Sequence, residues 1–287
     1  MVSIIKQIKK SVGFIYVKNG NVFHPAGTGF FVSVATGYDS SKSYFYFVTA
    51  KHVIQKKDGT FYDIAVRLNT FDNSSNLLPL PMNQLHIFTH DDEDVDIALF
   101  PMIPNEKIYD ILTIGSDILS TEKIIEDEKI EEGGDVLFSG LFSSHIGKQR
   151  NQPIVRFGKI SLISDEKITW KVDDDPPKLV DLYLMECQSY GGNSGSPVFF
   201  KLDRFRESSE NKIKMHEKYY LAGVMTGSFN QSRKIENIET INEQFSWQNI
   251  GIAAVTPAYK LHDILFSDEL NKIRKDNDDL ENAKKKV

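Results

Sequence analysis

The chain has 287 residues, of which 40% are hydrophobic and 26% are charged, a balance typical of globular proteins with one or two hydrophobic cores. Its formal net charge is −6, and its 34 lysines and arginines are scattered among 40 acidic residues, which excludes a broad basic surface for nucleic acid. No stretch is long and apolar enough for a signal sequence or a membrane span, and the single cysteine, Cys187, excludes an internal disulfide. We therefore expect a cytoplasmic protein that binds neither nucleic acid nor membranes.

Short strand-like runs fill residues 1–103. The segment GFIYVKNGNVFHP places two β-prone runs around Asn19-Gly20, a pair preferred in tight hairpin turns. Further runs follow at GTGFFVSV, SYFYFVTA, DIAVRL, QLHIFTH and DIALFPM. These runs predict one sheet-rich unit.

The composition changes twice more along the chain. Residues 104–132 are polar and acidic and predict a linker, and strand-like runs resume over residues 133–256 at DVLFSGLF, PIVRFGKISLI, LVDLYLMEC, SPVFFKL, YYLAGVMTGS and IGIAAVTP. Two units of several short strands each predict an all-β fold of paired β-barrels or sandwiches.

A C-terminal helix is predicted within residues 257–287. Thr256 is a suitable N-cap, Pro257 suits the first helical position, and Leu261, Ile264 and Leu265 follow at helical spacing. The charged tail after this helix is expected to fray into solvent.

Ser194 stands among glycines in YGGNSGSPVFF, just ahead of an apolar run. A serine hydroxyl becomes a useful nucleophile when a base takes its proton and a third group orients that base. His52 follows an apolar strand in YFYFVTAKHVI, and Asp96 immediately precedes the run IALF. The order His52, Asp96, Ser194 matches one of the serial arrangements known for the Ser-His-Asp triad.

These motifs resemble those of the chymotrypsin-like (trypsin-like) serine proteases, especially the bacterial Deg-type branch. The matching segments are GTGFFV, VTAKHV, DIALF, GGNSGSPVF, LAGVMTGS and NIGIAAVTP, which together span roughly residues 8–266. The resemblance implies two antiparallel β-barrels with the site in the cleft between them. Unlike the Deg proteases, the chain has no recognisable peptide-binding module after the catalytic unit.

The resemblance also implies a role for each residue of the site. Ser194 would attack the scissile carbonyl, His52 would take its proton and return it to the leaving amine, and Asp96 would hold the imidazole. The backbone N–H groups of Gly192 and Ser194 would form the oxyanion hole. We expect a cytoplasmic endopeptidase that works through an acyl-enzyme, without metal or cofactor, on a narrow set of protein or peptide substrates in processing or signalling. An activating or regulatory protein partner is one way to restrain such a protease. The alternative function is a catalytically silent protein-binding module on the same scaffold.

The substrate pocket is less clearly marked. By resemblance, Gln188 would lie near the base of the primary pocket, with Thr226, Gly227 and Ser228 along its wall and Ala253 opposite. No acidic residue falls at the base, so the expected preference is for a neutral side chain rather than for Arg or Lys.

Asn193 departs from the digestive members of the family. Those proteases carry an aspartate just before the nucleophile, and it pairs with a new N-terminal ammonium after zymogen cleavage. Because asparagine has no charge to compensate a buried ammonium, we expect the uncleaved chain to be active.

Three charged stretches are predicted to be loops. The run DDEDVD at residues 91–96 lacks the spacing and the glycine of a calcium loop, so a solvated loop without a metal is predicted there. Residues 203–217 and 230–244 are predicted to be loops that border the substrate strand and can contact an extended partner.

Overall fold

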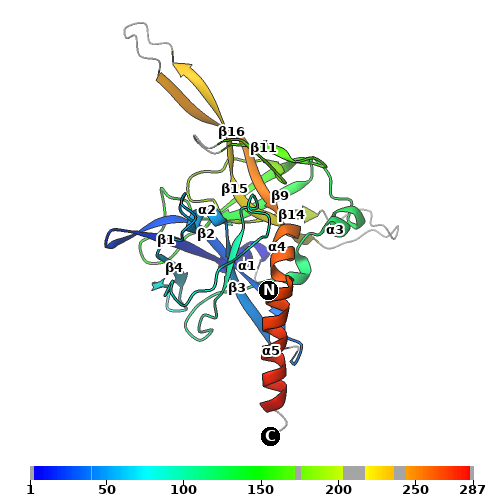
Figure 1. Ribbon diagram of the computed structural model, residues 1–287. Coiled ribbons are helices and arrows are strands. Elements are labelled where there is room, and N and C mark those ends of the chain that lie inside the picture. The colour runs from blue at the N-terminus through cyan, green and yellow to red at the C-terminus, as the bar shows by residue number, and fades with distance from the viewer. Residues whose placement is uncertain (1–2, 40, 172–175, 203–216, 236–243, 285–287) are drawn as a thin grey trace.

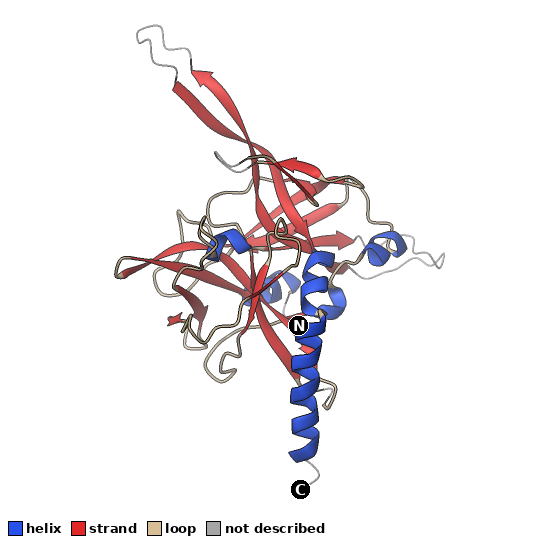
Figure 2. Cartoon of the chain, in the orientation of Figure 1, coloured by secondary structure: helices blue, strands red, loops and turns tan. Residues whose placement is uncertain are grey.

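Two β-sheet units follow one another along the chain, and a pair of helices ends it (Figures 1 and 2). The computed structural model describes residues 3–39, 41–171, 176–202, 217–235 and 244–284. Among the helices in these ranges, none is long and apolar enough to cross a lipid bilayer.

The first unit is an eight-stranded sheet that follows helix α1 (Ile4–Ser11). Its strands are β1 (Val12–Asn19), β2 (Val22–Ala35), β3 (Ser43–Thr49), β4 (Ile64–Asn69), β5 (Ser75–Pro79), β6 (Phe88–Thr89), β7 (Ala98–Pro101) and β8 (Ile114–Gly115). They lie in the order β5-β4-β1-β2-β3-β7-β6, and β8 joins β2 as the one parallel neighbour among the described pairs. The short helix α2 (Lys51–Ile54) follows β3 directly.

The hairpin predicted at Asn19-Gly20 is present, with its turn one residue further along. Asn19 pairs with Val22, so the two turn residues are Gly20 and Asn21. Of these, Gly20 alone has a positive φ, +60°, as expected for a type II′ turn. Further along β2, Phe31 pairs with Phe47 on β3, and both side chains point into the core. Their rings pack edge to face, with 4.9 Å between the ring centroids.

The second unit is a closed six-stranded barrel. Its strands are β9 (Asp135–Gly140), β10 (Ile154–Ile163), β13 (Tyr183–Glu186), β14 (Pro197–Leu202), β15 (Lys218–Ile235) and β16 (Gln244–Pro257), in the order β10-β13-β16-β15-β14-β9. A separate two-stranded sheet, β11 (Ile168–Trp170) with β12 (Lys178–Val180), is inserted between β10 and β13. The chain reaches this unit through a 3₁₀ turn, η1 (Ser116–Ile118), and helix α3 (Glu122–Asp127).

The predicted all-β fold with two successive units and a C-terminal helix is confirmed. The two units differ in detail, because only the second is a closed barrel. In the first sheet, the end strands β5 and β6 do not pair with each other over the described residues, so the sheet stays open. β8 lies inside the range 104–132 that we predicted to be a linker, and it pairs with the first sheet. The domain boundaries at residues 103 and 133 stay predictions.

The C-terminal helices are α4 (Ala258–Leu265) and α5 (Asp268–Lys284). Pro257 rather than Thr256 occupies the N-cap of α4, because the Thr256 hydroxyl bonds to the Thr226 hydroxyl at 2.6 Å instead. The expectation of a frayed tail is wrong for residues up to Lys284. Arg274, only 6% exposed, donates from its guanidinium to the Tyr46 hydroxyl at 3.0 Å and to the Leu265 carbonyl at 2.6 Å, which fastens α5 to the first sheet.

Candidate active site

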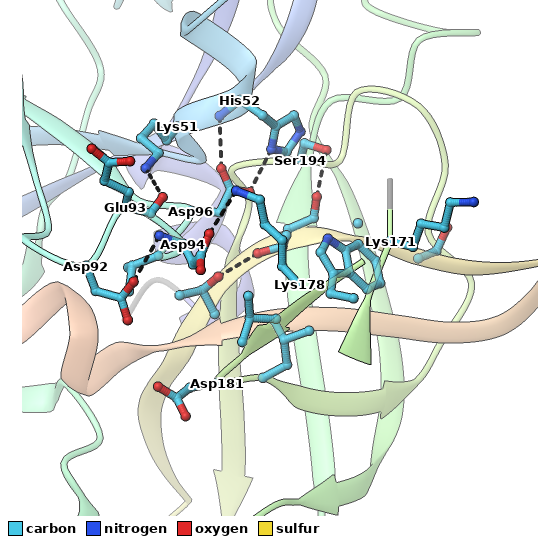
Figure 3. Close-up of a pocket in the computed structure, with 18 of the residues that line it drawn as sticks. Lys51, His52, Asp92, Glu93, Asp94, Asp96, Lys171, Lys178, Asp181 and Ser194 are labelled. Atoms are coloured by element: carbon cyan, nitrogen blue, oxygen red, sulfur yellow. Dashed lines mark hydrogen bonds and ion pairs between the residues drawn. The ribbon is translucent and has the colours of Figure 1, made fainter. Parts of the chain in front are cut away.

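The pairing of β3 with β7 brings His52 and Asp96 together. Thr49 lies opposite Ala98 in this pair, so α2, which follows β3, and the residues that precede β7 meet at one end of the sheet. The Nδ1 atom of His52 lies 2.7 Å from Oδ2 of Asp96, and the His52 backbone N–H donates to Oδ1 at 2.9 Å (Figure 3). Both oxygens of one carboxylate therefore hold the same histidine.

Asp96 fixes the tautomer and the charge of His52. A carboxylate only accepts hydrogen bonds, so Nδ1 carries the proton and the neutral ring keeps its lone pair on Nε2. Burial lowers the pKa of His52, but the attraction of Asp96 and their hydrogen bond raise it, and the balance is a pKa above the ordinary value. The His52 side chain remains 49% exposed and that of Asp96 17%, so the ring is open to a substrate while its partner is shielded.

Ser194 lies in a tight turn that is fixed by both units. Its carbonyl accepts from the Thr28 N–H on β2 at 2.9 Å, and the next N–H, of Gly195, donates to Met225 on β15 at 2.7 Å. The Ser194 hydroxyl donates to the carbonyl of Thr226 at 3.3 Å. Ser194 and His52 line the same cavity (Figure 3).

Position 195 requires a glycine because the turn packs against the first sheet. Its φ is +83°, and a Cβ there would lie 2.0 Å from the Thr28 carbonyl and 2.4 Å from the Thr49 hydroxyl. Any side chain would therefore push the turn of Ser194 away from the first unit. The close packing of the two units at this point accounts for the small residue after the serine.

Gly192 shapes the backbone before the serine. The Asn193 N–H donates to the Tyr190 carbonyl at 3.0 Å, and Gly192 has φ +95° while Gly191 has no positive φ, which defines a type II turn. Among the described residues, neither the N–H of Gly192 nor that of Ser194 has a hydrogen-bond partner. The backbone N–H groups on either side of Asn193 therefore have no partner of their own within the described part of the chain.

Asn193 holds this turn through its side chain. It is 1% exposed, its Oδ1 accepts from the Tyr190 N–H at 2.8 Å, and its Nδ2 donates to the Leu141 carbonyl at 2.7 Å. A neutral amide satisfies both backbone groups at once. This position therefore needs no cationic partner, and the activity of the uncleaved chain stays a prediction.

Replacing Asn193 with aspartate should destabilise the protein by about 1–3 kcal/mol, the usual cost of an unsatisfied buried polar group. An ionised carboxylate still accepts from Tyr190, but it has no hydrogen to donate to the Leu141 carbonyl. A protonated carboxyl can donate, and burial raises the pKa of this carboxyl above its unfolded value of about 4, so the deficit should shrink as the pH falls from 7 toward about 4. Urea unfolding at pH 7 and pH 4 measures this, with Asn83→Asp at an exposed position as the control. Equal effects of the two substitutions would contradict the prediction.

The cavity at the site has a volume of about 430 Å³ and lies between the two units. Six of the residues predicted for the site contribute to its lining: His52, Asp96, Ser194, Thr226, Gly227 and Ser228. Gly192, Gln188 and Ala253 are not among its lining residues. Gly192 lies two residues before Ser194. Gln188 is exposed and accepts a hydrogen bond from the Tyr190 hydroxyl at 2.8 Å, while Ala253 faces the barrel core beside Met185 and Val255. Their assignment to substrate binding stays a prediction.

The sequence did not indicate the ion pairs that join the two units beside this cavity. Asp94 pairs with Lys178 at 2.8 Å, and Asp92 pairs with Lys167 at 3.5 Å, so the loop predicted to be merely solvated joins the first unit to the β11–β12 sheet (Figure 3). Over the described ranges, no His, Cys, Asp and Glu side chains gather in a group that could hold a metal ion.

Trp170 is the other residue that the sequence did not indicate. Its ring packs edge to face on Phe229, 4.8 Å between centroids, and lies over Gly227, where a Cβ would approach the ring to 3.2 Å. A glycine inside a strand is a signal for such a close approach, but the sequence does not reveal which distant residue approaches. The indole also lines the cavity and adds apolar surface to it.

Comparisons with known proteins identify the fold. No protein-family model and no curated protein sequence matches this chain. Among solved structures, the MamO protease domain from Magnetospirillum magneticum (apo form) aligns over 91% of this chain and 98% of its own, with 13% identity and a TM-score of 0.50. The active form of the Rv3671c protease from M. tuberculosis aligns over 91% of this chain and 82% of its own, with 16% identity and a TM-score of 0.48. The likeness to the first of these, together with the two β-units described above, shows that the chain has the chymotrypsin-like protease fold.

Proposed function

We propose that the protein is a serine endopeptidase that cleaves peptide bonds of protein substrates. The observation that carries this proposal is the pair of hydrogen bonds by which Asp96 holds His52 beside the cavity that Ser194 also lines. Two backbone N–H groups without a partner among the described residues lie in the turn of Ser194 and support the same reaction. A silent binding module would have no need for this arrangement.

In the proposed mechanism, the Ser194 hydroxyl turns from the Thr226 carbonyl to Nε2 of His52. It gives its proton to that nitrogen as its oxygen attacks the scissile carbonyl, and Asp96 stabilises the imidazolium that forms. The N–H groups of Gly192 and Ser194 donate to the oxyanion of the tetrahedral intermediate. His52 then protonates the leaving amine, and water releases the acyl group from Ser194 by the reverse sequence.

The proposed substrates are a narrow set of cytoplasmic proteins in processing or signalling. The ion pair between Asp94 and Lys178 supports this narrow choice of substrates, because both residues line the cavity where substrate would bind and the pair joins the two units there. We also propose that the primary pocket takes a neutral side chain, and that an activating or regulatory protein controls access to the site.

Labelling with a fluorophosphonate probe tests the proposal. The intact mass of the full-length protein should increase by one adduct, which should be absent from Ser194→Ala and nearly absent from His52→Ala. Thermal unfolding of all three proteins checks that they are folded. A folded wild-type protein that takes no adduct either alone or in a cell lysate would instead favour the catalytically silent binding module.

A further inference from the structure

Strand β15 continues far beyond the barrel to which it belongs. Its first half, Lys218–Val224, pairs with β14, and its pairing with β16 begins at Gly223, so the two neighbours overlap only at Gly223 and Val224. From Asn230 to Ile235 the only described strand that pairs with β15 is β16, where Asn249 to Gln244 lie opposite. This two-stranded extension, residues 230–235 and 244–249, is called the arm here, and it projects away from the barrel (Figure 1).

The arm leaves one edge of β15 without a strand partner over the described residues. Such an edge presents a row of backbone N–H and C=O groups that can pair with another extended chain. A projecting two-stranded ribbon is also only marginally stable in water, and a third strand or a packed face is needed to secure it. Residues 230–235 were predicted to be a loop, so the finding that they are strand changes what this segment can bind.

This free edge begins inside the candidate active site. Thr226 accepts the hydrogen bond from the Ser194 hydroxyl, and Thr226, Gly227 and Ser228 line the cavity. The arm begins only two residues later on the same strand. At about 3.4 Å per residue, the stretch from Thr226 to Ile235 extends about 30 Å. An extended peptide that lies along β15 in the cavity is therefore directed onto the arm.

The β11–β12 sheet does not occupy this edge. Trp170 packs over Gly227 and on Phe229, and Ile168 joins the cluster of Ala254 and Leu184. These contacts are made to the face of the barrel, perpendicular to the hydrogen-bonding direction of its strands. The face is covered, while the edge remains available for pairing.

We propose that the arm is a docking strip for the substrate itself. An extended segment of the substrate protein, several residues away from the scissile bond on one side, pairs with the edge of β15 as a third strand of the arm. Main-chain hydrogen bonds supply most of the affinity in this mode of binding, so the arm selects proteins with an extended or unfolded segment of about ten residues next to the cleavage site. This inference rests on the proposed endopeptidase function.

Peptide length gives the first test. A synthetic library of 20-residue peptides is used to find one that the wild-type protein cleaves near its middle, and that peptide is then shortened to three residues on one side of the scissile bond or on the other. Shortening on one side should lower kcat/KM by tenfold or more, and shortening on the other side should change it by less than about twofold. Equal rates for all three lengths would overturn the inference.

Backbone substitution tests the pairing on the unaltered enzyme. Single N-methyl groups placed along the sensitive side of the long peptide should slow cleavage at alternate positions, because only every second N–H of a paired strand faces its neighbour. Slowing without this alternation would indicate contacts by side chains instead, and would contradict strand pairing.

An arm-shortened variant provides the matched control. Asn-Gly replaces residues 231–248, which joins Asn230 to its paired residue Asn249 by a preferred hairpin turn. The variant should cleave the shortened peptide with the same kcat/KM as wild type. It should cleave the full-length peptide no faster than the shortened one. Labelling of Ser194 by the fluorophosphonate separates the two proposals. Normal labelling with no effect of length refutes only the docking strip, whereas absence of labelling in wild type, both alone and in a cell lysate, refutes the endopeptidase function. If instead wild type sediments as a dimer, the variant as a monomer, and length has no effect, the occupant of the edge is a second copy of the chain and the inference is wrong.

Discussion

The Asp96→Asn variant should fold normally and lose about 10⁴-fold in kcat/KM. Asp96 accepts hydrogen bonds from both the ring and the backbone of His52, whereas an asparagine side chain has only one oxygen with which to accept. An amide that turns its NH₂ group toward Nδ1 stabilises the tautomer with the proton on Nε2. That nitrogen then has no lone pair to take the proton from Ser194, and in the Ser-His-Asp triad this exchange lowers kcat by about 10⁴-fold.

The pH profile of the same variant separates chemistry from misfolding. The reaction needs neutral His52, so kcat/KM falls as the pH drops through its pKa. Because Asp96 raises that pKa, the acid limb of the wild-type profile should lie above the ordinary histidine value of about 6.5. In Asp96→Asn the attraction is gone while the burial that lowers the pKa remains, so the acid limb should move to lower pH. Asp91→Asn, an exposed position in the same loop, is the control and should retain the wild-type profile. An acid limb that stays in place in Asp96→Asn would refute the role of Asp96.

The sequence predicted those features that depend on residues close together in the chain. The β1–β2 hairpin needs only alternating side chains and a glycine in its turn, and both are visible in the sequence. His52 and Asp96 were found because each stands at the end of a strand, and the pairing of those two strands brings them together. The glycines around Ser194 indicated an unusual backbone, which the positive φ angles of Gly192 and Gly195 explain.

The remaining features depend on contacts between distant segments. The Asp94–Lys178 pair joins residues 84 positions apart, and Trp170 lies against a glycine on a strand that follows much later. The Thr256 hydroxyl matched the pattern of an N-cap, yet a partner on β15 holds it in the barrel. The charged composition of residues 230–235 favoured a loop, and only pairing with β16 makes them a strand. The other stretch predicted to be a loop, residues 203–217, lies outside the described part of the chain except for Glu217, and so do residues 236–243 of the stretch 230–244.

Gly192→Ala should lower kcat/KM by about 10²–10³-fold, which corresponds to about 2.7–4 kcal/mol in the barrier and is the usual effect of losing one oxyanion donor. Gly192 has φ +95°, and a Cβ would contact the Leu141 side chain at 3.0 Å and its carbonyl at 3.2 Å. An alanine is strained in this backbone conformation and has no open space there, so the turn must change shape. A changed turn redirects the Gly192 N–H away from the place where the oxyanion forms.

Gly191→Ala is the matched control for this prediction. Gly191 has no positive φ, and no atom lies within 4 Å of a Cβ added to it, so alanine fits there without changing the turn. Both variants remove one glycine from the same loop, but only Gly192→Ala should slow peptide cleavage and fluorophosphonate labelling together, because the phosphonyl oxygen needs the same donors as the oxyanion. Similar losses in both variants would mean that the loop needs general flexibility, and the oxyanion role of Gly192 would then be wrong. A loss of kcat/KM in Gly192→Ala alone would instead show that the rate depends on one backbone N–H. The type II turn at Gly192 sets the direction of this N–H.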